Sequence, residues 1–138
     1  MRGFYVLVIE TQRPLVQASL PAGDWTDALA WLRQQPASWQ VLADPAHVKF
    51  GVSVRVGALR DTVLEQSKDA GLAIYERDIA LRVDERRQAL SGFESFGDDQ
   101  IRTVARRFGA DVALVDRAQQ LTFPVLYQNQ HFVVYDLR

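Results

Sequence analysis

The stretch VLADPAHVKFGVSVR, residues 41 to 55, decides how this chain folds. Its first residues form a short apolar run that ends at an Asp-Pro pair, which is typical of a buried strand followed by a turn. A histidine, a lysine, a glycine, a serine and an arginine follow, spaced by small or apolar residues. The stretch is therefore either a loop that grips a ligand at the end of a buried strand or the polar rim of a small domain.

The second half of this stretch has two possible interpretations. The alternating valines of VSVRV, residues 52–56, on their own favour a strand. However, residues 62–66 (TVLEQ) also look like a strand, and two parallel strands need a crossover of a dozen or so residues, which is usually helical. Residues 45–61 suit that crossover, so we predict a short helix from about Val52 to Arg60 whose apolar face is formed by Val52, Val56 and Leu59.

The rest of the chain alternates helical and strand-like patterns on either side of this stretch. This alternation predicts an α/β three-layer sandwich of Rossmann or flavodoxin type, with a mostly parallel sheet that ends in an antiparallel C-terminal hairpin. The other predicted elements are a helix capped by Asp24 that stops before Pro36, a strand at 39–44, a helix from Lys68 to Leu90, a helix that begins after Asp98 or Asp99 and is closed by Gly109, a strand at 111–116, and a hairpin at 124–137.

The composition of the chain limits its chemistry. With 138 residues, 48% of them hydrophobic, it is long enough for one domain with its own core, which we place at residues 24–138. The absence of cysteine excludes disulfides, thiolate metal sites and a cysteine nucleophile. A net charge of -1 argues against nucleic acid or anionic lipid as the main partner. Two well-separated histidines do not suggest a zinc site, and no motif suggests a cofactor.

The N-terminal residues 1–23 combine an apolar stub with a linker. The apolar run from Phe4 to Ile9 is far shorter than the roughly 20 residues of a membrane-spanning helix, and no signal-peptide cleavage site follows it. This run is either an edge strand of the domain or the end of a membrane helix. The pattern does not separate these alternatives.

Polar residues follow each predicted strand at the point where it ends. Ligands of α/β proteins bind beyond the carboxyl ends of the strands, so these side chains are the candidate binding site. The alternative is that polar residues simply mark where buried strands reach the surface, with His47 as a solvent-exposed histidine. The candidate ligand-binding residues are Asp44, His47, Arg55, Lys68, Asp69 and Asp116.

Within this set, Arg55 has a more specific prediction. We expect its guanidinium to make a two-point contact with the carboxylate of Asp44 or Asp69, because the forked geometry of arginine favours that pairing. Such a contact would hold the loop together rather than bind a ligand. No phosphate-binding loop, dinucleotide-binding motif or nucleophile elbow occurs in the sequence, so no catalytic residue is assigned.

Arginines and acids alternate through residues 76–107. Ion pairs between residues three or four apart on a helix explain most such patterns. A partner-binding face on the predicted helix is the alternative.

The run from Trp25 through Arg138 resembles the soluble C-terminal domain of large bacterial multi-pass membrane proteins that look like integral-membrane glycosyltransferases of the GT-C type. The resemblance rests on DWTDALAWLR, VLADPAHVKFGVSVR, RDTVLEQSKDAGLAIYERDIALRVDER, RRFGADVALVD and FPVLYQNQHFVVYDLR. It implies that this domain lies on the extracytoplasmic side of a membrane and that FYVLVI is the end of a last membrane helix. In that class the acid that drives glycosyl transfer lies in the membrane part, so the resemblance implies no catalytic residue in this chain.

These observations lead to two functional hypotheses. The first is a non-catalytic extracytoplasmic accessory domain that packs on the membrane part of its protein or binds a glycan, a lipid-linked sugar or another partner. The second is a small stand-alone α/β enzyme or sugar-phosphate-binding protein, located in the cytoplasm if Met1 is the natural start. The second hypothesis requires that Asp44, His47, Lys68 and Asp116 converge in one pocket.

Overall fold

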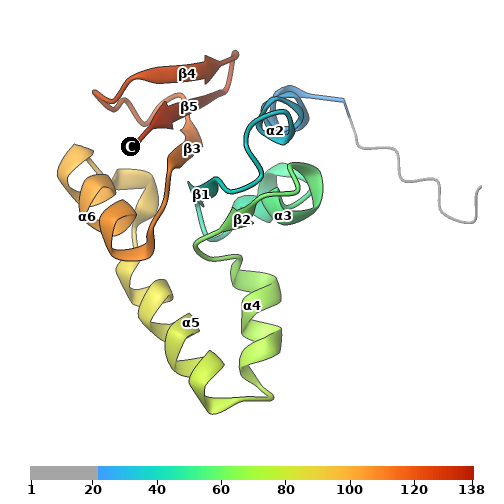
Figure 1. The fold of residues 1–138 in the computed structure, drawn as a ribbon, viewed down its shortest axis with the longest axis vertical. Helices are drawn as coiled ribbons and strands as arrows, with labels where there is room; N and C mark the ends of the chain where they lie inside the picture. The colour runs from blue at the N-terminus through green and yellow to red at the C-terminus, as the bar shows by residue number, and fades with distance from the viewer. Residues whose placement is uncertain (1–21) are drawn as a thin grey trace, which may run out of the picture.

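The structure, a computed structural model, describes residues 22–138 (Figure 1). The predictions for the apolar run at the N-terminus and for most of the linker after it concern residues outside this range. The described chain forms one five-stranded sheet with the strand order β2-β1-β3-β5-β4. Its strands are β1 (Gln40–Ala43), β2 (Asp61–Thr62), β3 (Val112–Asp116), β4 (Val125–Gln128) and β5 (Phe132–Asp136).

Five α-helices and two short 3-10 helices accompany the sheet within residues 22–138. The α-helices are α2 (Asp24–Arg33), α3 (Val54–Gly57), α4 (Gln66–Ala73), α5 (Arg77–Ala89) and α6 (Asp98–Phe108). The 3-10 helices are η1 (His47–Phe50), which follows β1, and η2 (Phe93–Ser95), which precedes α6. None of the helices in this range is long and apolar enough to cross a membrane.

The sheet is mixed, with two parallel and two antiparallel strand pairs, so the prediction of a mostly parallel sheet is not confirmed. Strand β1 pairs in parallel with β2 and with β3, whereas β5 runs antiparallel to β3 and to β4. The predicted α/β class and the antiparallel C-terminal hairpin are confirmed. The hairpin is not added at a distant edge but joins directly to the central strand β3, and a Rossmann or flavodoxin-like arrangement is therefore not confirmed.

Side chains of the central strands alternate between the two faces of the sheet, as the strand pleat requires. One face packs against α6 and the other against α2. The core on the α6 side includes Leu42, Ala113, Val115, Ile101 and Val104. The core on the α2 side includes Val41, Ala43, Leu114, Leu29 and Leu32.

Helices α2 and α6 each bury one apolar face, but their N-caps differ from the prediction. Trp25, Leu29 and Leu32 are buried on α2, spaced by four and then three residues. The N-cap residues are Gly23 and Gly97, so Asp24 and Asp98 begin their helices instead of capping them. Acidic residues in the first turn still stabilise each helix through its dipole.

The stretch predicted as a helix from Val52 to Arg60 contains only the single turn of α3. Ser53 is its N-cap, and its hydroxyl accepts a hydrogen bond from the Val56 amide. The predicted apolar face is wrong, because Val56 and Leu59 are exposed whereas Val54 and Ala58 are buried. A close approach at Gly57 sets this orientation: a Cβ there would lie 2.5 Å from Cδ1 of Leu29 on α2.

The predicted helix from Lys68 to Leu90 is two helices, α4 and α5, separated by a reversal of the chain (Figure 1). Glu76 has an extended backbone at the reversal, with φ of -146° and ψ of 129°. Along this segment Leu90 is buried, but Leu72 and Tyr75 are exposed. The two helices project from the sheet, so these side chains have no surface of the domain to cover.

Candidate functional site

A pocket of about 400 Å³ lies beyond the carboxyl ends of β1 and β3. This volume falls within the range of small-molecule sites. We call it the strand-end pocket. Four aromatic residues line it, namely Trp25, Phe50, Phe93 and Phe132, and its polar residues are Asp44, His47, Lys49, Glu94, Asp116 and Gln119.

The position of the strand-end pocket follows from the way the chain leaves the two parallel strands. After β1, the chain turns to the α2 side, where Val52 and Val54 join the core. After β3, it turns to the α6 side, where Leu121 and Phe123 pack. Neighbouring parallel strands whose connections diverge to opposite faces leave a crevice between their ends, which is the usual ligand position in open α/β sheets.

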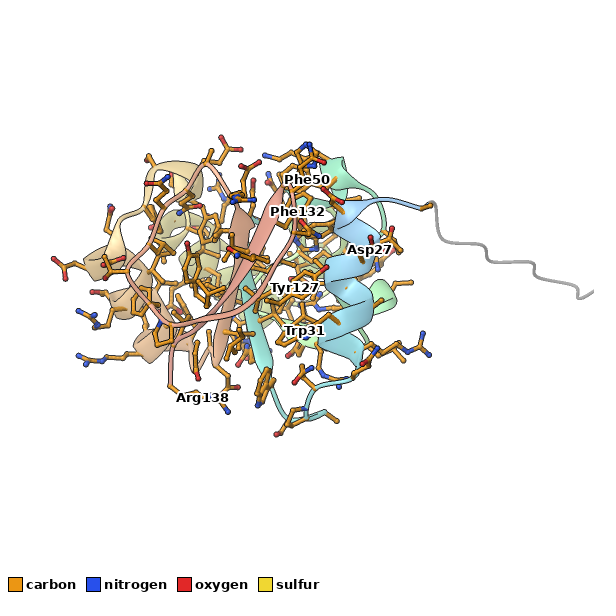
Figure 2. The ribbon with its side chains drawn as sticks, turned by 90° about the horizontal axis from the view of Figure 1, so that it is seen from above. Asp27, Trp31, Phe50, Tyr127, Phe132 and Arg138 are labelled. Atoms are coloured by element: carbon orange, nitrogen blue, oxygen red, sulfur yellow. The ribbon has the colours of Figure 1, made fainter. Side chains whose placement is uncertain are left out.

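One wall of the pocket is a packed group of three aromatic rings. The ring centroid of Trp25 lies 5.3 Å from that of Phe50 and 5.1 Å from that of Phe132, and the two phenylalanine rings are also 5.1 Å apart. The indole Nε1 of Trp25 donates a hydrogen bond of 2.7 Å to the carbonyl oxygen of Val52, which fixes its orientation. Phe50 and Phe132 lie together near the start of α2 (Figure 2). The group gives the pocket a rigid apolar surface.

An ion-pair bridge forms a second side of the pocket. Lys49 Nζ lies 2.7 Å from Asp44 Oδ2, contacts the carboxylate of Glu94, and stands 5.0 Å from the ring centroid of Phe50. Burial alone would raise the pKa of Asp44, but hydrogen bonds from Lys49 and from the Ala46 amide lower it below the ordinary value. The bridge joins η1 to η2 across the crevice.

Asp116 and Gln119 supply the polar groups on the β3 side of the pocket. Asp116 Oδ1 accepts a hydrogen bond of 2.8 Å from the Ala118 amide, which holds the turn after the strand. Within residues 22–138, Oδ2 of Asp116 accepts no hydrogen bond. Gln119 Nε2 donates to the carbonyl oxygens of Phe93 and Phe96, at 2.9 and 3.1 Å. The pocket therefore presents acceptor oxygens on this side.

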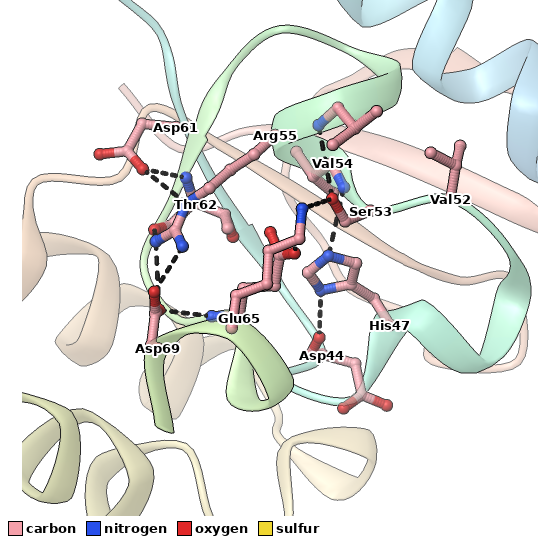
Figure 3. Close-up of polar contacts among 12 residues, drawn as sticks. Asp44, His47, Val52, Ser53, Val54, Arg55, Asp61, Thr62, Glu65 and Asp69 are labelled. Carbon is pink, nitrogen blue, oxygen red and sulfur yellow. Dashed lines mark hydrogen bonds and ion pairs between the residues drawn. The ribbon is translucent and has the colours of Figure 1, made fainter. Parts of the chain in front are cut away.

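His47 is fully buried, so the prediction of a solvent-exposed histidine is wrong. Its Nδ1 is 2.7 Å from the carbonyl oxygen of Asp44, and its Nε2 accepts a hydrogen bond of 3.2 Å from the Val54 amide (Figure 3). These partners assign a neutral ring protonated at Nδ1. Burial lowers the pKa of His47, and the hydrogen bond to Asp44 offsets this only in part. Both ring nitrogens are used, and the histidine joins the turn after β1 to the start of α3.

The predicted two-point contact of Arg55 exists, and its partner is Asp69 (Figure 3). The distances are 2.5 Å from Nη1 to Oδ1 and 3.1 Å from Nη2 to Oδ2. Arg55 Nε also lies 3.2 Å from Oδ1 of Asp61. Burial alone would raise the pKa of Asp69, but hydrogen bonds from Arg55 and from the Glu65 amide lower it below the ordinary value. The other predicted partner, Asp44, pairs with Lys49 instead.

Lys68 belongs to the same polar cluster as Arg55 and Asp69. Its Nζ donates a hydrogen bond of 3.0 Å to Ser53 Oγ and lies 3.0 Å from Oε1 of Glu65, which is fully buried. The contact with Glu65 is an ion pair rather than an aligned hydrogen bond, because neither carboxylate oxygen accepts one from the part of the chain that the structure describes. This cluster joins α3 to α4 and does not line the strand-end pocket.

The six predicted site residues therefore fall into two groups. Asp44, His47 and Asp116 line the strand-end pocket, while Arg55, Lys68 and Asp69 lie in the polar cluster outside it. The sequence analysis missed the aromatic wall, Glu94 and Gln119 as pocket residues. They come from α2, η1, η2, β5 and a loop, and no spacing in the sequence connects these segments. Among residues 22–138, no three histidine or acidic side chains are placed to hold a metal ion.

Comparison of this chain with known proteins identified no related protein. No protein-family model matches the chain, and neither the curated proteins nor the solved structures contain a match. The resemblance to domains of membrane glycosyltransferases therefore stays a prediction, and the proposal of a function has to rest on the chemistry of the strand-end pocket.

Proposed function

We propose that this chain is a non-catalytic binding domain whose strand-end pocket takes a neutral, polyhydroxylated ligand, namely a sugar unit of a glycan. The observation that supports this most directly is the combination of a rigid aromatic wall with acceptor oxygens in the same pocket. Aromatic rings offer an apolar surface to the carbon face of a sugar ring. Carboxylate and amide oxygens accept hydrogen bonds from hydroxyl groups.

The charge of the strand-end pocket favours a neutral sugar over a sugar phosphate. Three carboxylates, those of Asp44, Glu94 and Asp116, line the pocket, whereas Lys49 is the single lysine or arginine among its lining residues. Lys49 already contacts two of these carboxylates. A phosphate group would meet uncompensated negative charge, which lowers its affinity. The sugar-phosphate hypothesis is therefore the weaker one.

The side chains of the pocket give little support to catalysis by a serine, threonine or histidine, which favours the binding interpretation. None of the lining residues is a serine or threonine, and both nitrogens of His47 are occupied. The lowered pKa of Asp44 keeps this carboxyl ionised, so it does not hold a proton that it could give to a leaving group.

The proposal includes the setting that the sequence resemblance implies. On this view the domain is the extracytoplasmic part of a membrane protein that acts on glycans, and it holds a glycan near the membrane-embedded part of the same protein. The resemblance supports the location, and the chemistry of the strand-end pocket supports the ligand class.

The test is an NMR titration of the nitrogen-15-labelled full chain with unbranched oligosaccharides of glucose, mannose and N-acetylglucosamine, and with the matching sugar 1-phosphates. We expect neutral saccharides to shift the indole signal of Trp25 and the amides around Gln119. The Asp116→Asn variant removes a charged acceptor and is expected to weaken binding about threefold to tenfold. Val125→Ala, an exposed change on β4, serves as the control and leaves affinity unchanged.

Two results would contradict the proposal. One is a set of titrations in which no neutral saccharide shifts any signal of the pocket. The other is preferential binding of the sugar phosphates, because that would require more positive charge in the pocket than Lys49 supplies.

A further inference from the structure

Helices α4 and α5 form a two-helix arm that extends away from the sheet (Figure 1). We call residues 66–89 the α4–α5 arm. No side chain of α5 is buried, and Asp69 is the one buried side chain of α4. Most helical stability in proteins comes from packing of an apolar face, so an arm with so little burial gains little from its own domain.

The free end of the α4–α5 arm carries large apolar side chains that face solvent. The exposed fractions are 55% for Leu72, 80% for Ile74, 87% for Tyr75 and 60% for Leu81. Single exposed apolar residues are common, but four of them gathered at the end of a projecting element mark an interaction surface.

One exposed face of α5 has a charge pattern that complements itself. Arg77, Leu81 and Glu85 are spaced by four residues, so they lie along one face of the helix, and all three are exposed. From N- to C-terminus the stripe has a basic residue, a leucine and an acidic residue, and in the opposite direction the order is acidic, leucine, basic. Two antiparallel copies of this stripe place Arg77 of each copy opposite Glu85 of the other, with Leu81 facing Leu81.

The side chains of this stripe are available for such contacts. Within the described range, residues 22–138, the Arg77 guanidinium makes no hydrogen bond or ion pair. Glu85 Oε1 accepts from Nη2 of Arg107 at 2.5 Å, but about half of the Glu85 side chain remains exposed. A carboxylate can accept from two arginines at once because it has two oxygens.

We propose that the chain forms a two-fold symmetric dimer through the α4–α5 arm, with two antiparallel α5 helices crossing near Leu81. A two-fold interface uses the same patch on both copies, which is what a self-complementary stripe provides. The apolar residues at the end of each arm then lie against the later turns of α5 in the second copy. A lipid surface is the less favoured occupant, because two acidic residues, Glu76 and Asp78, flank Arg77 at the end of the arm.

The test measures the mass of the full chain by sedimentation velocity over a wide range of concentrations. The parent is expected to show a reversible monomer–dimer equilibrium. Arg77→Glu and Glu85→Arg each place like charges opposite one another and should raise the dimer dissociation constant about tenfold or more. The double variant R77E/E85R restores opposite charges and should recover the parent equilibrium.

Matched controls separate dimerisation from folding. Arg107→Gln removes the ion pair within the chain but keeps the stripe, so it should dimerise like the parent. Val125→Asp changes an exposed apolar residue on β4, away from the α4–α5 arm, and should also dimerise. Circular dichroism confirms that each variant folds.

Three results would overturn the proposal. The first is a parent chain that stays monomeric at every concentration. The second is a folded double variant that does not recover dimerisation. The third is a monomeric chain that floats with phosphatidylcholine vesicles through the α4–α5 arm, because that result would assign the apolar end to a membrane.

Discussion

The guanidinium of Arg55 and the carboxylate of Asp69 contact each other at two points across the crossover that links β1 to α4. Arg55 lies on the single turn of α3, and Asp69 lies in the first turn of α4. Arg55 Nη2 also lies 3.3 Å from the carbonyl oxygen of Thr62, the last residue of β2. The side chain therefore ties together three short elements that have little regular structure of their own.

Replacing Arg55 by alanine should destabilise the domain. The variant leaves a largely buried carboxylate without its charged partner, and we expect a loss of about 2–4 kcal/mol in the free energy of unfolding. Urea denaturation followed by circular dichroism measures this loss. Arg55→Lys keeps the charge but not the forked geometry, so it should recover only part of the stability.

Arg106→Ala is the matched control for this prediction, because it removes an exposed arginine of α6, away from the α4–α5 arm, and should change the free energy of unfolding by less than about 0.5 kcal/mol. An Arg55→Ala variant as stable as the parent would show that the contact with Asp69 has no structural role.

The core elements of the fold could be predicted because burial imposes a local pattern. Helices α2 and α6 have their apolar residues spaced by three and four, and β1 and β3 are short apolar runs between polar residues. Each pattern is complete within one segment of chain. The contact between Arg55 and Asp69 was also predictable, because the geometry of arginine favours a carboxylate and few were within reach along the chain.

The features that could not be predicted depend on contacts between distant segments. Strand β3 pairs with the antiparallel strand β5 instead of a further parallel strand. The sequence of neither strand indicates which strand will lie beside it. The spacing of apolar residues is helical on both sides of the reversal at Glu76, so this spacing alone predicts one continuous helix. His47 is buried because η1 brings it against the start of α3, which the sequence around the histidine does not indicate.

The same limit applies to the candidate site. The rule that ligands bind beyond the carboxyl ends of strands correctly predicted Asp44 and Asp116 as pocket residues, because it depends only on where strands end. It also selected Lys68, which instead contacts Ser53 and Glu65. The aromatic wall assembles only after α2, η1 and β5 pack together.

Leu114 should be one of the costliest core residues to truncate. It is 2% exposed, lies in the core on the α2 side, and stands between Ala43 of β1 and Val134 of β5. Leu114→Ala removes apolar contacts and leaves a cavity, which should lower the free energy of unfolding by about 2–5 kcal/mol. Val125→Ala, at an exposed edge position, should cost less than about 0.5 kcal/mol. Equal costs in urea denaturation would mean that β3 is not the centre of the core.

Two glycine-to-alanine changes should have opposite effects on stability. At Gly57 a new Cβ would lie 2.5 Å from Leu29 Cδ1 and 2.9 Å from Val52 Cγ1, and Leu29 is fully buried. The crowding should destabilise the domain by about 1–3 kcal/mol. At Gly71 nothing lies within 4 Å of the new Cβ, and the position is within α4. Gly71→Ala should therefore stabilise the domain by about 0.5–1 kcal/mol through helix propensity and a less flexible unfolded chain.

Both variants are measured by thermal and urea denaturation under the same conditions. A Gly57→Ala variant as stable as Gly71→Ala would mean that α3 and α2 are not held as close as their packing indicates.

The buried His47 should make the stability of the domain depend on pH in the weakly acidic range. Burial, only partly offset by the hydrogen bond to Asp44, lowers its pKa below the ordinary value of 6.5. Between the lowered pKa and 6.5, the unfolded chain binds a proton at this position and the folded chain does not. The free energy of unfolding contributed by His47 is therefore full above about pH 6.5 and decreases as the pH falls below it.

Urea denaturation at a series of pH values from weakly alkaline to weakly acidic measures this decrease. His47→Gln is expected to be less stable than the parent throughout, because it disturbs the hydrogen bonds to Asp44 and Val54. Its stability should also change less with pH over this range than that of the parent. Val125→Ala is the control, since it changes an exposed residue without a titratable group and should keep the pH dependence of the parent. If His47→Gln and the parent lose stability in parallel as the pH falls, the buried histidine is not the group that responds.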